Sequence, residues 1–262
     1  MITASARRAV AVAATLLLVA ACGTGPGQAQ PGSAAGSSTP AATVTVFAAA
    51  SLTEAFTQIG ADFEKVSGST VTFNFGSSAT LATQINSGAP ADVFAAASPA
   101  TMKTVIDAGG ATAPVDFVSN SLQIAVPTGN PARISGLADF ANESRTIALC
   151  APQVPCGAAA ERVFAVAGIT PKPDTLEQDV KATVAKVAAD EVDAALVYRT
   201  DVIAAADDVD GIDFPESASA VNPYPIAVLT SSKVSAVAQA FVDHVRSPQG
   251  QAVLAEAGFS KP

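Results

Sequence analysis

The chain has 262 residues, 49% of them hydrophobic, and its formal net charge is −9 at pH 7. A chain of this length and apolar content can bury a substantial core, in one large domain or two of medium size. The acidic balance argues against nucleic acid as a partner, because that affinity depends on neutralising phosphates with lysine and arginine. An acidic protein can still bind an anion, but only through a local site of aimed hydrogen-bond donors.

The N-terminal part is predicted to serve targeting and tethering. Residues 1–21 have the pattern of a signal peptide, in which Arg7 and Arg8 precede the apolar run "AVAVAATLLLVAA", too short for the roughly 20 apolar residues of a membrane span. "VAAC" resembles a bacterial lipobox, so we expect lipid on Cys22; an ordinary signal peptide is the alternative. Residues 22–43 are uncharged and rich in Gly, Pro and Ser, as in a flexible tether. We therefore expect an extracytoplasmic protein, anchored by lipid to the outer face of the cell membrane.

From residue 43 onward, strand-like runs alternate with helical patterns. Strands are predicted at 43–49, 70–75, 91–97 and 121–127. Helices are predicted from Leu52, at about 79–87 and from Pro99. The first helix shows one apolar stripe with three- and four-residue steps, formed by Leu52, Ala55, Phe56, Ile59, Phe63 and Val66. This alternation predicts a mostly parallel sheet with helices on both faces.

A stretch rich in Pro and Gly interrupts this rhythm, and a second unit follows it. Strands are predicted there at 145–150 and 192–198, and helices at 157–168 and 179–190. After a short Pro-rich break the chain returns with a strand at 224–230 and helices at 234–246 and 248–258. We therefore expect two domains: residues 44–125 with 222–262 as domain I, and residues 126–221 as domain II.

Three predicted helix starts combine small residues with hydroxyls or a cysteine, each directly after a strand. In open parallel sheets, ligands bind beyond the carboxyl ends of the strands, where helices begin. Ser51 opens one helix, Ser77 and Ser78 open the next, and Cys156 opens one in the second unit. Helix starts offer free N–H groups and a positive dipole end, which suits an anion. The plainer interpretation of Ser51 is a capping box with Glu54.

No catalytic pattern competes with these helix starts. His244 is the only histidine and lies beside Asp243 on a predicted C-terminal helix. The sequence has no G-x-S-x-G elbow, phosphate loop or metal-spaced His/Cys cluster. Cys150 and Cys156 remain as a pair; outside the cytoplasm they could form a disulfide or stay reduced. The sequence thus favours a binding protein and not an enzyme.

Five blocks distributed over residues 44–262 carry a family resemblance. They are "VTVFAAASLTEAF", "FGSSATLATQINSGAPADVFAAA", "VPCG", "QDVKATV" and "DAALVYRTDV". They resemble the molybdate-binding proteins of bacterial molybdate ABC importers. The resemblance implies a type II periplasmic-binding-protein fold, an α/β architecture of two domains with a ligand cleft between them. It also implies a monomer without cofactor that captures molybdate, and with it tungstate, for an ABC permease.

The resemblance further implies that the oxyanion is held by hydrogen bonds without a counter-charge. Carried over motif by motif, hydroxyl or N–H donors would come from Ser51, Ser78, Cys156, Val180 and Tyr198. Cys156, expected to use only its N–H, stands where the family usually has a small residue such as Ala. "GSSAT" has fewer hydroxyls than the family's frequent triple serine, so Ser77 is the alternative to Ser78. A shell of donors alone would exclude hydrogen phosphate, whose proton needs an acceptor, but would discriminate poorly between molybdate and tungstate.

Other interpretations remain open at this point. Val180 could be only a core residue, four positions before Val184, and the Tyr198 hydroxyl could cap a neighbouring loop. The ligand could be sulfate or an organic acid, and a basic side chain in the cleft, with Arg199 as the candidate, would favour the latter. An extracytoplasmic hydrolase is another alternative. An iron-binding relative would need paired tyrosines, and the chain has only Tyr198 and Tyr224.

Overall fold

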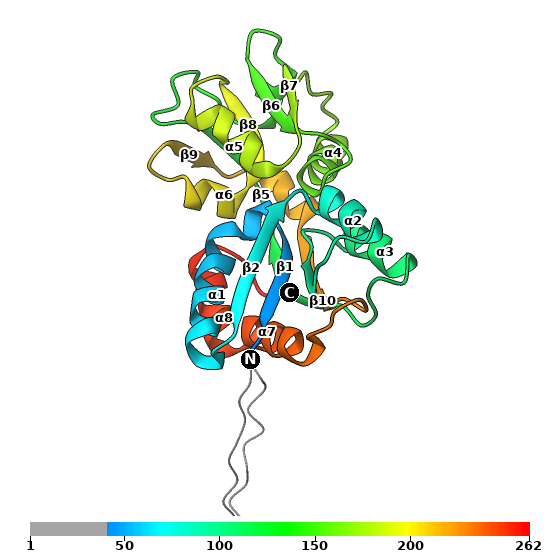
Figure 1. Ribbon diagram of the computed structural model, residues 1–262. Helices are drawn as coiled ribbons and strands as arrows, with labels where there is room; N and C mark the ends of the chain where they lie inside the picture. The colour runs from blue at the N-terminus through cyan, green and yellow to red at the C-terminus, as the bar shows by residue number, and fades with distance from the viewer. Residues whose placement is uncertain (1–40) are drawn as a thin grey trace, which may run out of the picture. The chain divides into compact units, whose positions relative to one another are not determined.

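The computed structural model of the protein describes residues 41–262 (Figure 1). The predicted signal peptide, the lipidation site Cys22 and the tether up to residue 40 lie outside the described residues. Thr43, expected to end the tether, already begins the first strand. Within residues 41–262, no helix has the length and apolar character that a membrane crossing requires.

The first lobe is built on a five-stranded sheet with the order β2-β1-β3-β10-β4. Its strands are β1 (Thr43–Ala49), β2 (Thr70–Gly76), β3 (Val93–Ala95), β4 (Val115–Asn120) and β10 (Asn222–Val228). Its helices are η1 (Ala50–Leu52), α1 (Thr53–Ser67), α2 (Ser78–Asn86), α3 (Pro99–Asp107), α7 (Ser235–Arg246) and α8 (Pro248–Glu256). One apolar core joins the sheet to α1, α7 and α8, and another joins it to α2 and α3, so helices cover both faces (Figure 1).

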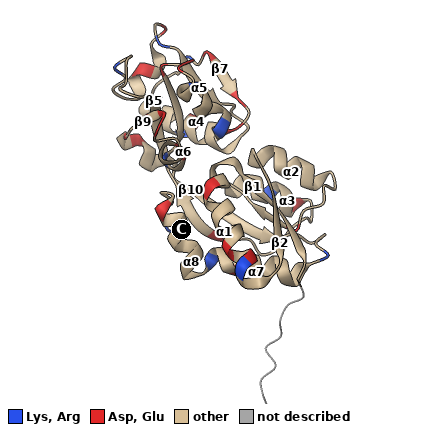
Figure 2. Ribbon diagram, turned by 60° about the vertical axis from the view of Figure 1, so that its left-hand side comes forward, with Lys and Arg blue, Asp and Glu red and all other residues tan. Residues whose placement is uncertain are grey.

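The second lobe repeats this plan with the strand order β7-β6-β8-β5-β9. Its strands are β5 (Leu122–Pro127), β6 (Ile147–Cys150), β7 (Thr175–Glu177), β8 (Ala194–Tyr198) and β9 (Val209–Ile212). Its helices are η2 (Leu137–Ala141), α4 (Pro155–Ala167), α5 (Val180–Ala188), α6 (Arg199–Ala204) and η3 (Pro215–Ala220). A single apolar core holds these elements together. Positions of lysine, arginine, aspartate and glutamate are distributed along the elements of both lobes (Figure 2).

The chain crosses between the lobes at two points that lie side by side. Ser121 joins β4 to β5, and Val221 joins η3 to β10. The crossings are neighbours because β4 and β10 pair in register at Asn120 and Asn222. The domain boundary expected between residues 125 and 126 stays a prediction. If the domains are divided by the sheet to which each strand belongs, the first crossing lies at Ser121.

The crossings also explain two wrong expectations about the sheets. Each sheet is mixed and not mostly parallel, with two parallel and two antiparallel pairings. The antiparallel pairings involve β5 and β10, which enter directly from the other lobe without the helical crossover that a parallel neighbour needs. The strand at 121–127 was expected to be the fourth strand of the first sheet. It lies in the second sheet instead, because the chain has already crossed to the other lobe at Ser121. The fourth strand of the first sheet in chain order is β4, which was not predicted.

The apolar stripe of the first predicted helix is confirmed except at its last position. Phe56 is fully buried and packs against Phe117 and Phe241, with ring centroids 5.8 and 6.1 Å apart. Val66, however, is 74% exposed. It lies in the last turn of α1, just before Gly68 ends the helix in a left-handed conformation with φ 69°. The spacing of apolar residues continues to the end of the helix, but the last turn extends beyond the core and leaves Val66 exposed.

Candidate functional site

A pocket between the two lobes is lined by the five residues expected to bind an oxyanion. Its walls come from the ends of β1, β2 and β8 and from the starts of four helices, η1, α2, α4 and α5. The lining residues include Ser51, Ser78, Cys156, Val180 and Tyr198. The space not filled by protein atoms is about 220 Å³, part of which is open to solvent. This size suits a small ion.

Ser51 lies within the short helix η1, which separates β1 from α1. The capping box with Glu54 is not formed, because α1 begins at Thr53 and no side chain caps its start. The Ser51 hydroxyl instead lies 2.8 Å from the hydroxyl of Tyr224 and is buried. The extra turn thus frees Ser51 from the local role that its sequence context suggested.

The two serines at the start of α2 are placed differently. Ser77 is the N-cap residue, but its side chain makes no capping bond. Its Oγ is buried and has no hydrogen-bond partner among the described residues. The Oγ of Ser78 accepts a hydrogen bond of 2.9 Å from the backbone N–H of Ala97. The hydroxyl of Ser77 therefore remains available to a ligand. The oxygen of Ser78 holds the loop after β3, but the Ser78 hydroxyl still carries a proton that it can donate.

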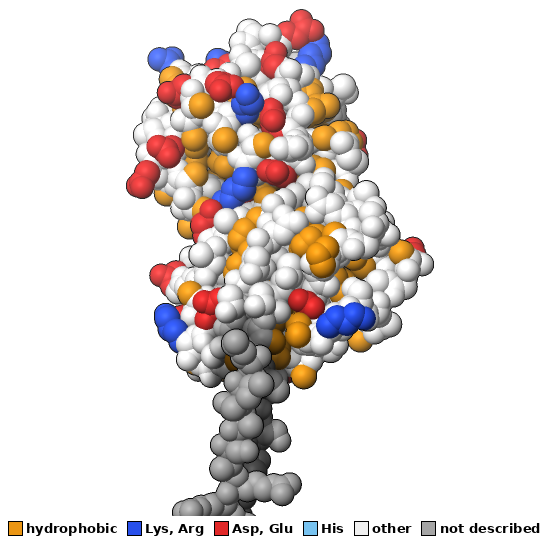
Figure 3. Space-filling model, in the orientation of Figure 1, with side chains coloured by type: hydrophobic (Ala, Val, Ile, Leu, Met, Phe, Trp, Pro, Cys, Tyr) orange, Lys and Arg blue, Asp and Glu red, His pale blue; other side chains and the backbone are white. Residues whose placement is uncertain are grey.

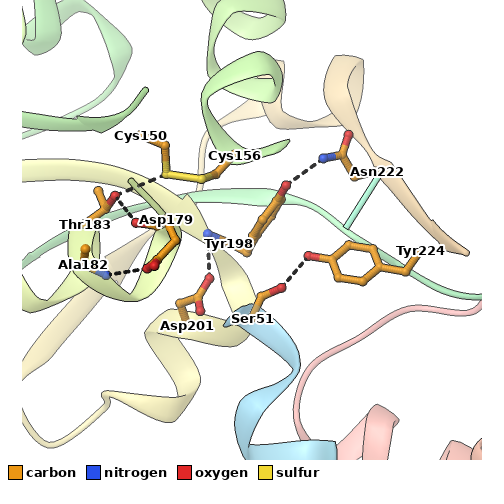
Figure 4. Close-up of a disulfide and its surroundings, with 10 residues drawn as sticks. All are labelled: Ser51, Cys150, Cys156, Asp179, Ala182, Thr183, Tyr198, Asp201, Asn222 and Tyr224. Carbon is orange, nitrogen blue, oxygen red and sulfur yellow. Dashed lines mark hydrogen bonds between the residues drawn. A yellow bond between two sulfur atoms is a disulfide. The ribbon is translucent and has the colours of Figure 1, made fainter. Parts of the chain in front are cut away.

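The start of α4 is attached to the end of β6 by a disulfide between Cys150 and Cys156, with the Cα atoms 5.8 Å apart (Figure 4). Pro155 occupies the first turn of α4 and has no N–H, so Cys156 carries the first backbone donor of the helix. A Cβ at Gly157 would lie 2.0 Å from the carbonyl oxygen of Ala151. Glycine at this position thus lets the helix start approach the preceding loop.

Val180 fits both of its interpretations. Its side chain is buried in the core of the second lobe together with Val184. Its backbone lies in the first turn of α5, directly after the N-cap Asp179, where N–H groups have no partner within the helix. The Asp179 side chain accepts from the N–H of Ala182 at 2.9 Å (Figure 4), which leaves the N–H of Val180 for the pocket.

Tyr198 ends β8, and its side chain is buried. Its hydroxyl does not cap a loop; it accepts a hydrogen bond of 2.7 Å from Nδ2 of Asn222 (Figure 4). Burial raises the pKa of the Tyr198 phenol well above its usual range, an effect that the bond from Asn222 partly offsets. The phenol therefore keeps its proton at neutral pH and can donate it.

No lysine or arginine lines this pocket in the described part of the chain. Arg199, the candidate for binding an organic acid, is exposed and is not among the lining residues. The charged residue that does line the pocket is Asp179, whose carboxylate accepts from Ala182. On the face drawn in Figure 3, acidic and basic side chains are dispersed without a cluster of one sign. An anion in this pocket would be held by neutral donors.

An ionic cluster that the sequence did not reveal lies beside the pocket. Lys181 on α5 contacts Glu54 on α1 of the other lobe at 2.8 Å and Asp201 on α6 at 3.6 Å. Asp201 is fully buried, and one of its oxygens has no hydrogen-bond partner among residues 41–262. Burial raises the pKa of Asp201 to about 7, although the charge of Lys181 opposes the shift.

The iron-binding alternative needed a tyrosine pair, and Tyr198 and Tyr224 do pack together, with ring centroids 6.0 Å apart. Burial raises the pKa of both phenols well above the usual value. Tyr224 does not line the pocket. No group of three His, Cys, Asp or Glu side chains within residues 41–262 is arranged to hold a metal ion.

Comparison with known proteins identifies the family. A family described as "Bacterial extracellular solute-binding protein" matches residues 44–260. The chain belongs to this family. The family is extracytoplasmic, as expected from the sequence, and its members are solute-binding proteins.

Relatives of this solute-binding protein share most of its length. The molybdate-binding protein ModA of Mycobacterium tuberculosis (strain H37Rv) is 41% identical over 244 residues, which cover 92% of each chain. ModA of Escherichia coli is 32% identical, with coverage of 83% of this chain and 88% of the relative. The family resemblance expected from the sequence is thus confirmed.

Solved structures confirm the fold. The periplasmic molybdate-binding protein of Azotobacter vinelandii is similar with a TM-score of 0.71 and 22% identity, over 84% of this chain and 99% of that one. The substrate-binding domain of a putative molybdenum ABC transporter from Clostridium difficile has a TM-score of 0.64 and 28% identity, over 85% and 100%. Two mixed α/β lobes around a cleft are therefore the periplasmic-binding-protein architecture.

Proposed function

We propose that this solute-binding protein captures molybdate, and with it tungstate, in the cleft between its lobes and delivers the ion to an ABC permease. The observation that carries the proposal is the pocket itself: it is small, it has no basic side chain, and helix starts from both lobes meet in it. The relatives that share 41% and 32% of their residues with this chain are named for molybdate. A binding role without catalysis follows from the same features.

Each donor of the proposed site has a structural basis. Ser51 and Tyr198 line the pocket from the two lobes and would supply hydroxyl donors, and Cys156 and Val180 line it at helix starts and would supply backbone N–H donors. At the start of α2 the unpartnered hydroxyl is that of Ser77, and we assign a side-chain contact to it. Ser78 would contribute its backbone N–H and its hydroxyl proton, because its oxygen accepts from Ala97 and that bond does not use the proton. This assignment keeps Ser78 and adds Ser77, the alternative position that the sequence left open.

The energetics of such a site are adequate for tight binding. A dianion removed from water must be fully hydrogen-bonded, and each hydrogen bond to a charged group contributes about 1.5–3 kcal/mol. Submicromolar affinity requires about −8 kcal/mol, so several donors suffice even after the cost of ordering and lobe closure. Sulfate, which is smaller, would leave donors stretched.

The location completes the proposal. Lipid on Cys22 would anchor the protein to the outer face of the cell membrane, and the uncharged tether of residues 22–43 would let it reach the permease. We expect a monomer, because one chain supplies both sides of the pocket.

Thermal melting of the chain without its signal peptide tests the function. A ligand that binds only the folded state raises the melting temperature. Molybdate and tungstate, each added alone, should raise it strongly, and sulfate and phosphate should not. A rise with sulfate or phosphate, or with none of the four anions, would contradict the proposed ligand.

A further inference from the structure

The hydroxyls that line the cleft can bind an anion in more than one way. A serine or tyrosine hydroxyl can either donate or accept a hydrogen bond. An oxyanion without a proton only accepts, whereas a protonated one, such as hydrogen phosphate, must also donate. The selectivity of the cleft therefore depends on where the proton of each hydroxyl points, and the residues behind Tyr198 and Ser51 determine this.

Behind Tyr198, the direction is fixed by Arg162 and Asn222. The guanidinium of Arg162 on α4 donates to Oδ1 of Asn222. A guanidinium has no acceptor, so the amide oxygen must face it and the amide nitrogen must face the other way. That nitrogen lies 2.7 Å from the Tyr198 hydroxyl and can only donate to it. Because the phenol accepts this bond through its oxygen, its proton is available for donation to the pocket that Tyr198 lines.

Behind Ser51, a second series of hydrogen bonds runs through Asn120 and Tyr224. The backbone N–H of Ser121 donates to Oδ1 of Asn120 at 3.0 Å, which fixes that amide as well. Its Nδ2 then donates to Thr200 Oγ1 at 2.9 Å and, over a longer distance of 3.4 Å, to the Tyr224 hydroxyl. Ser51 Oγ and the Tyr224 hydroxyl lie 2.8 Å apart, and either can donate. With Tyr224 as the donor, the proton of Ser51 is free for the pocket.

Both series of hydrogen bonds are protected from water. Asn120, Asn222, Tyr198 and Tyr224 are each at most 3% exposed. Buried polar groups are costly to leave unpaired, so these amides cannot turn without losing their partners. Arg162 is exposed on α4, and its bond to Asn222 is the outermost of the hydrogen bonds behind Tyr198.

We propose that Asn222, held by Arg162, is a positioning residue that keeps Tyr198 a donor, so that the cleft selects fully deprotonated oxyanions over protonated ones. The inference rests on the proposed function, since it concerns how the same pocket chooses among anions. Asn120 and Tyr224 act on Ser51 in the same way. Selectivity between molybdate and hydrogen phosphate would thus depend on residues that do not themselves touch the ion.

The test compares Asn222→Leu with the wild-type protein. Leucine is close to asparagine in size and uncharged, but it cannot donate to Tyr198, whose oxygen then becomes free to accept. Isothermal titration calorimetry at pH 7 would give Kd for molybdate and for inorganic phosphate. We expect the ratio of the phosphate Kd to the molybdate Kd to fall by about tenfold or more, the effect of one redirected hydrogen bond. Asn142→Leu, on an exposed loop of the second lobe, is the matched control and should leave the ratio unchanged.

Two further comparisons separate positioning from a merely structural role. In a Tyr198→Phe background, Asn222→Leu should no longer change the ratio, because the hydroxyl that it redirects is absent. Arg162→Met should lower the ratio as Asn222→Leu does, and Arg162→Lys, which retains a donor, should restore it. Since Arg162 is exposed, these variants test the inference even where Asn222→Leu does not fold.

The outcomes distinguish this inference from the proposed function. If wild-type protein binds molybdate but Asn222→Leu and Arg162→Met weaken both anions equally, the positioning role is overturned and the function stands. An effect of Asn222→Leu that persists without the Tyr198 hydroxyl would overturn it too. Wild-type protein that binds no molybdate would overturn the proposed function and this inference together.

Discussion

Replacing Ser77 with alanine should weaken oxyanion binding and at the same time stabilise the ligand-free protein. The Ser77 Oγ is buried without a partner among the described residues, and an unpaired buried hydroxyl costs about 1–3 kcal/mol. Its removal should raise the free energy of unfolding by about 1 kcal/mol. A hydrogen bond to a charged ligand contributes about 1.5–3 kcal/mol, so Kd for molybdate should rise roughly 10- to 150-fold.

The same substitution one residue later should have the opposite effect on stability. Ser78→Ala removes the acceptor of the Ala97 N–H, which is bonded at 2.9 Å in a buried environment. An unpaired buried N–H costs about 1–3 kcal/mol, so the free energy of unfolding should fall by that amount. The backbone N–H of Ser78 is unchanged, but the loss of its hydroxyl proton should raise Kd for molybdate roughly 10-fold or more.

Two measurements on each variant decide between these outcomes. Calorimetric titration gives Kd for molybdate, and urea unfolding followed by far-ultraviolet circular dichroism gives stability in a chain that has no tryptophan. Ser87→Ala, an exposed serine at the other end of α2, is the control for the substitution itself. Loss of affinity in Ser78→Ala with none in Ser77→Ala would refute the reasoning for Ser77 and leave the side-chain contact to the Ser78 hydroxyl alone.

Three further predictions follow from the surroundings of the pocket. The folded-state pKa of Asp201, about 7, lies above its ordinary value of 3.8, so the stability that its proton confers is lost as pH rises through 7. In urea unfolding of the wild-type protein, the free energy of unfolding should therefore fall by up to roughly 4 kcal/mol between pH 4 and pH 8. Asp201→Asn should not show this fall. Replacing both Cys150 and Cys156 with serine opens a loop of sequence separation 6 and should cost about 2 kcal/mol of unfolding free energy in the same assay. Lys181→Met breaks a partly exposed ion pair with Glu54 across the lobes and should weaken binding only a few-fold at low salt, with no difference at high salt; a large loss at high salt would contradict this.

Three parts of the candidate pocket could be predicted because they are local features of the sequence. A small or hydroxyl residue that follows an apolar strand and opens a helix is visible without coordinates, and the structure brings Ser51, Ser78 and Cys156 to one pocket. Val180 and Tyr198 were expected only from the family resemblance. Which of Ser77 and Ser78 has a protein partner was not accessible either, because it depends on which hydroxyl reaches the N–H of Ala97, 19 positions away from Ser78.

The residues behind the site left no signal in the sequence. Asn222 and Tyr198 are 24 positions apart, and Asn120 and Tyr224 are 104 apart. Polar contacts over such separations have no periodicity, and they exist only because the two crossings of the chain lie side by side. Strand β4 was missed for a related reason: "VDFVSN" ends in polar residues, and Ser119 and Asn120 are nevertheless buried by their neighbours in the sheet.

The paired crossings lie where a hinge between the lobes would be, and this has a consequence for a state in which the lobes are apart. A rotation of the lobes needs backbone changes only at a few such connecting residues, here Ser121 and Val221. Asn120 and Asn222 face each other at this axis, and points near an axis move least. The amides that orient the hydroxyls would therefore hold their positions while the helix starts separate. An arriving ion would meet hydroxyls already directed toward it, and little of its binding energy would be needed to order them.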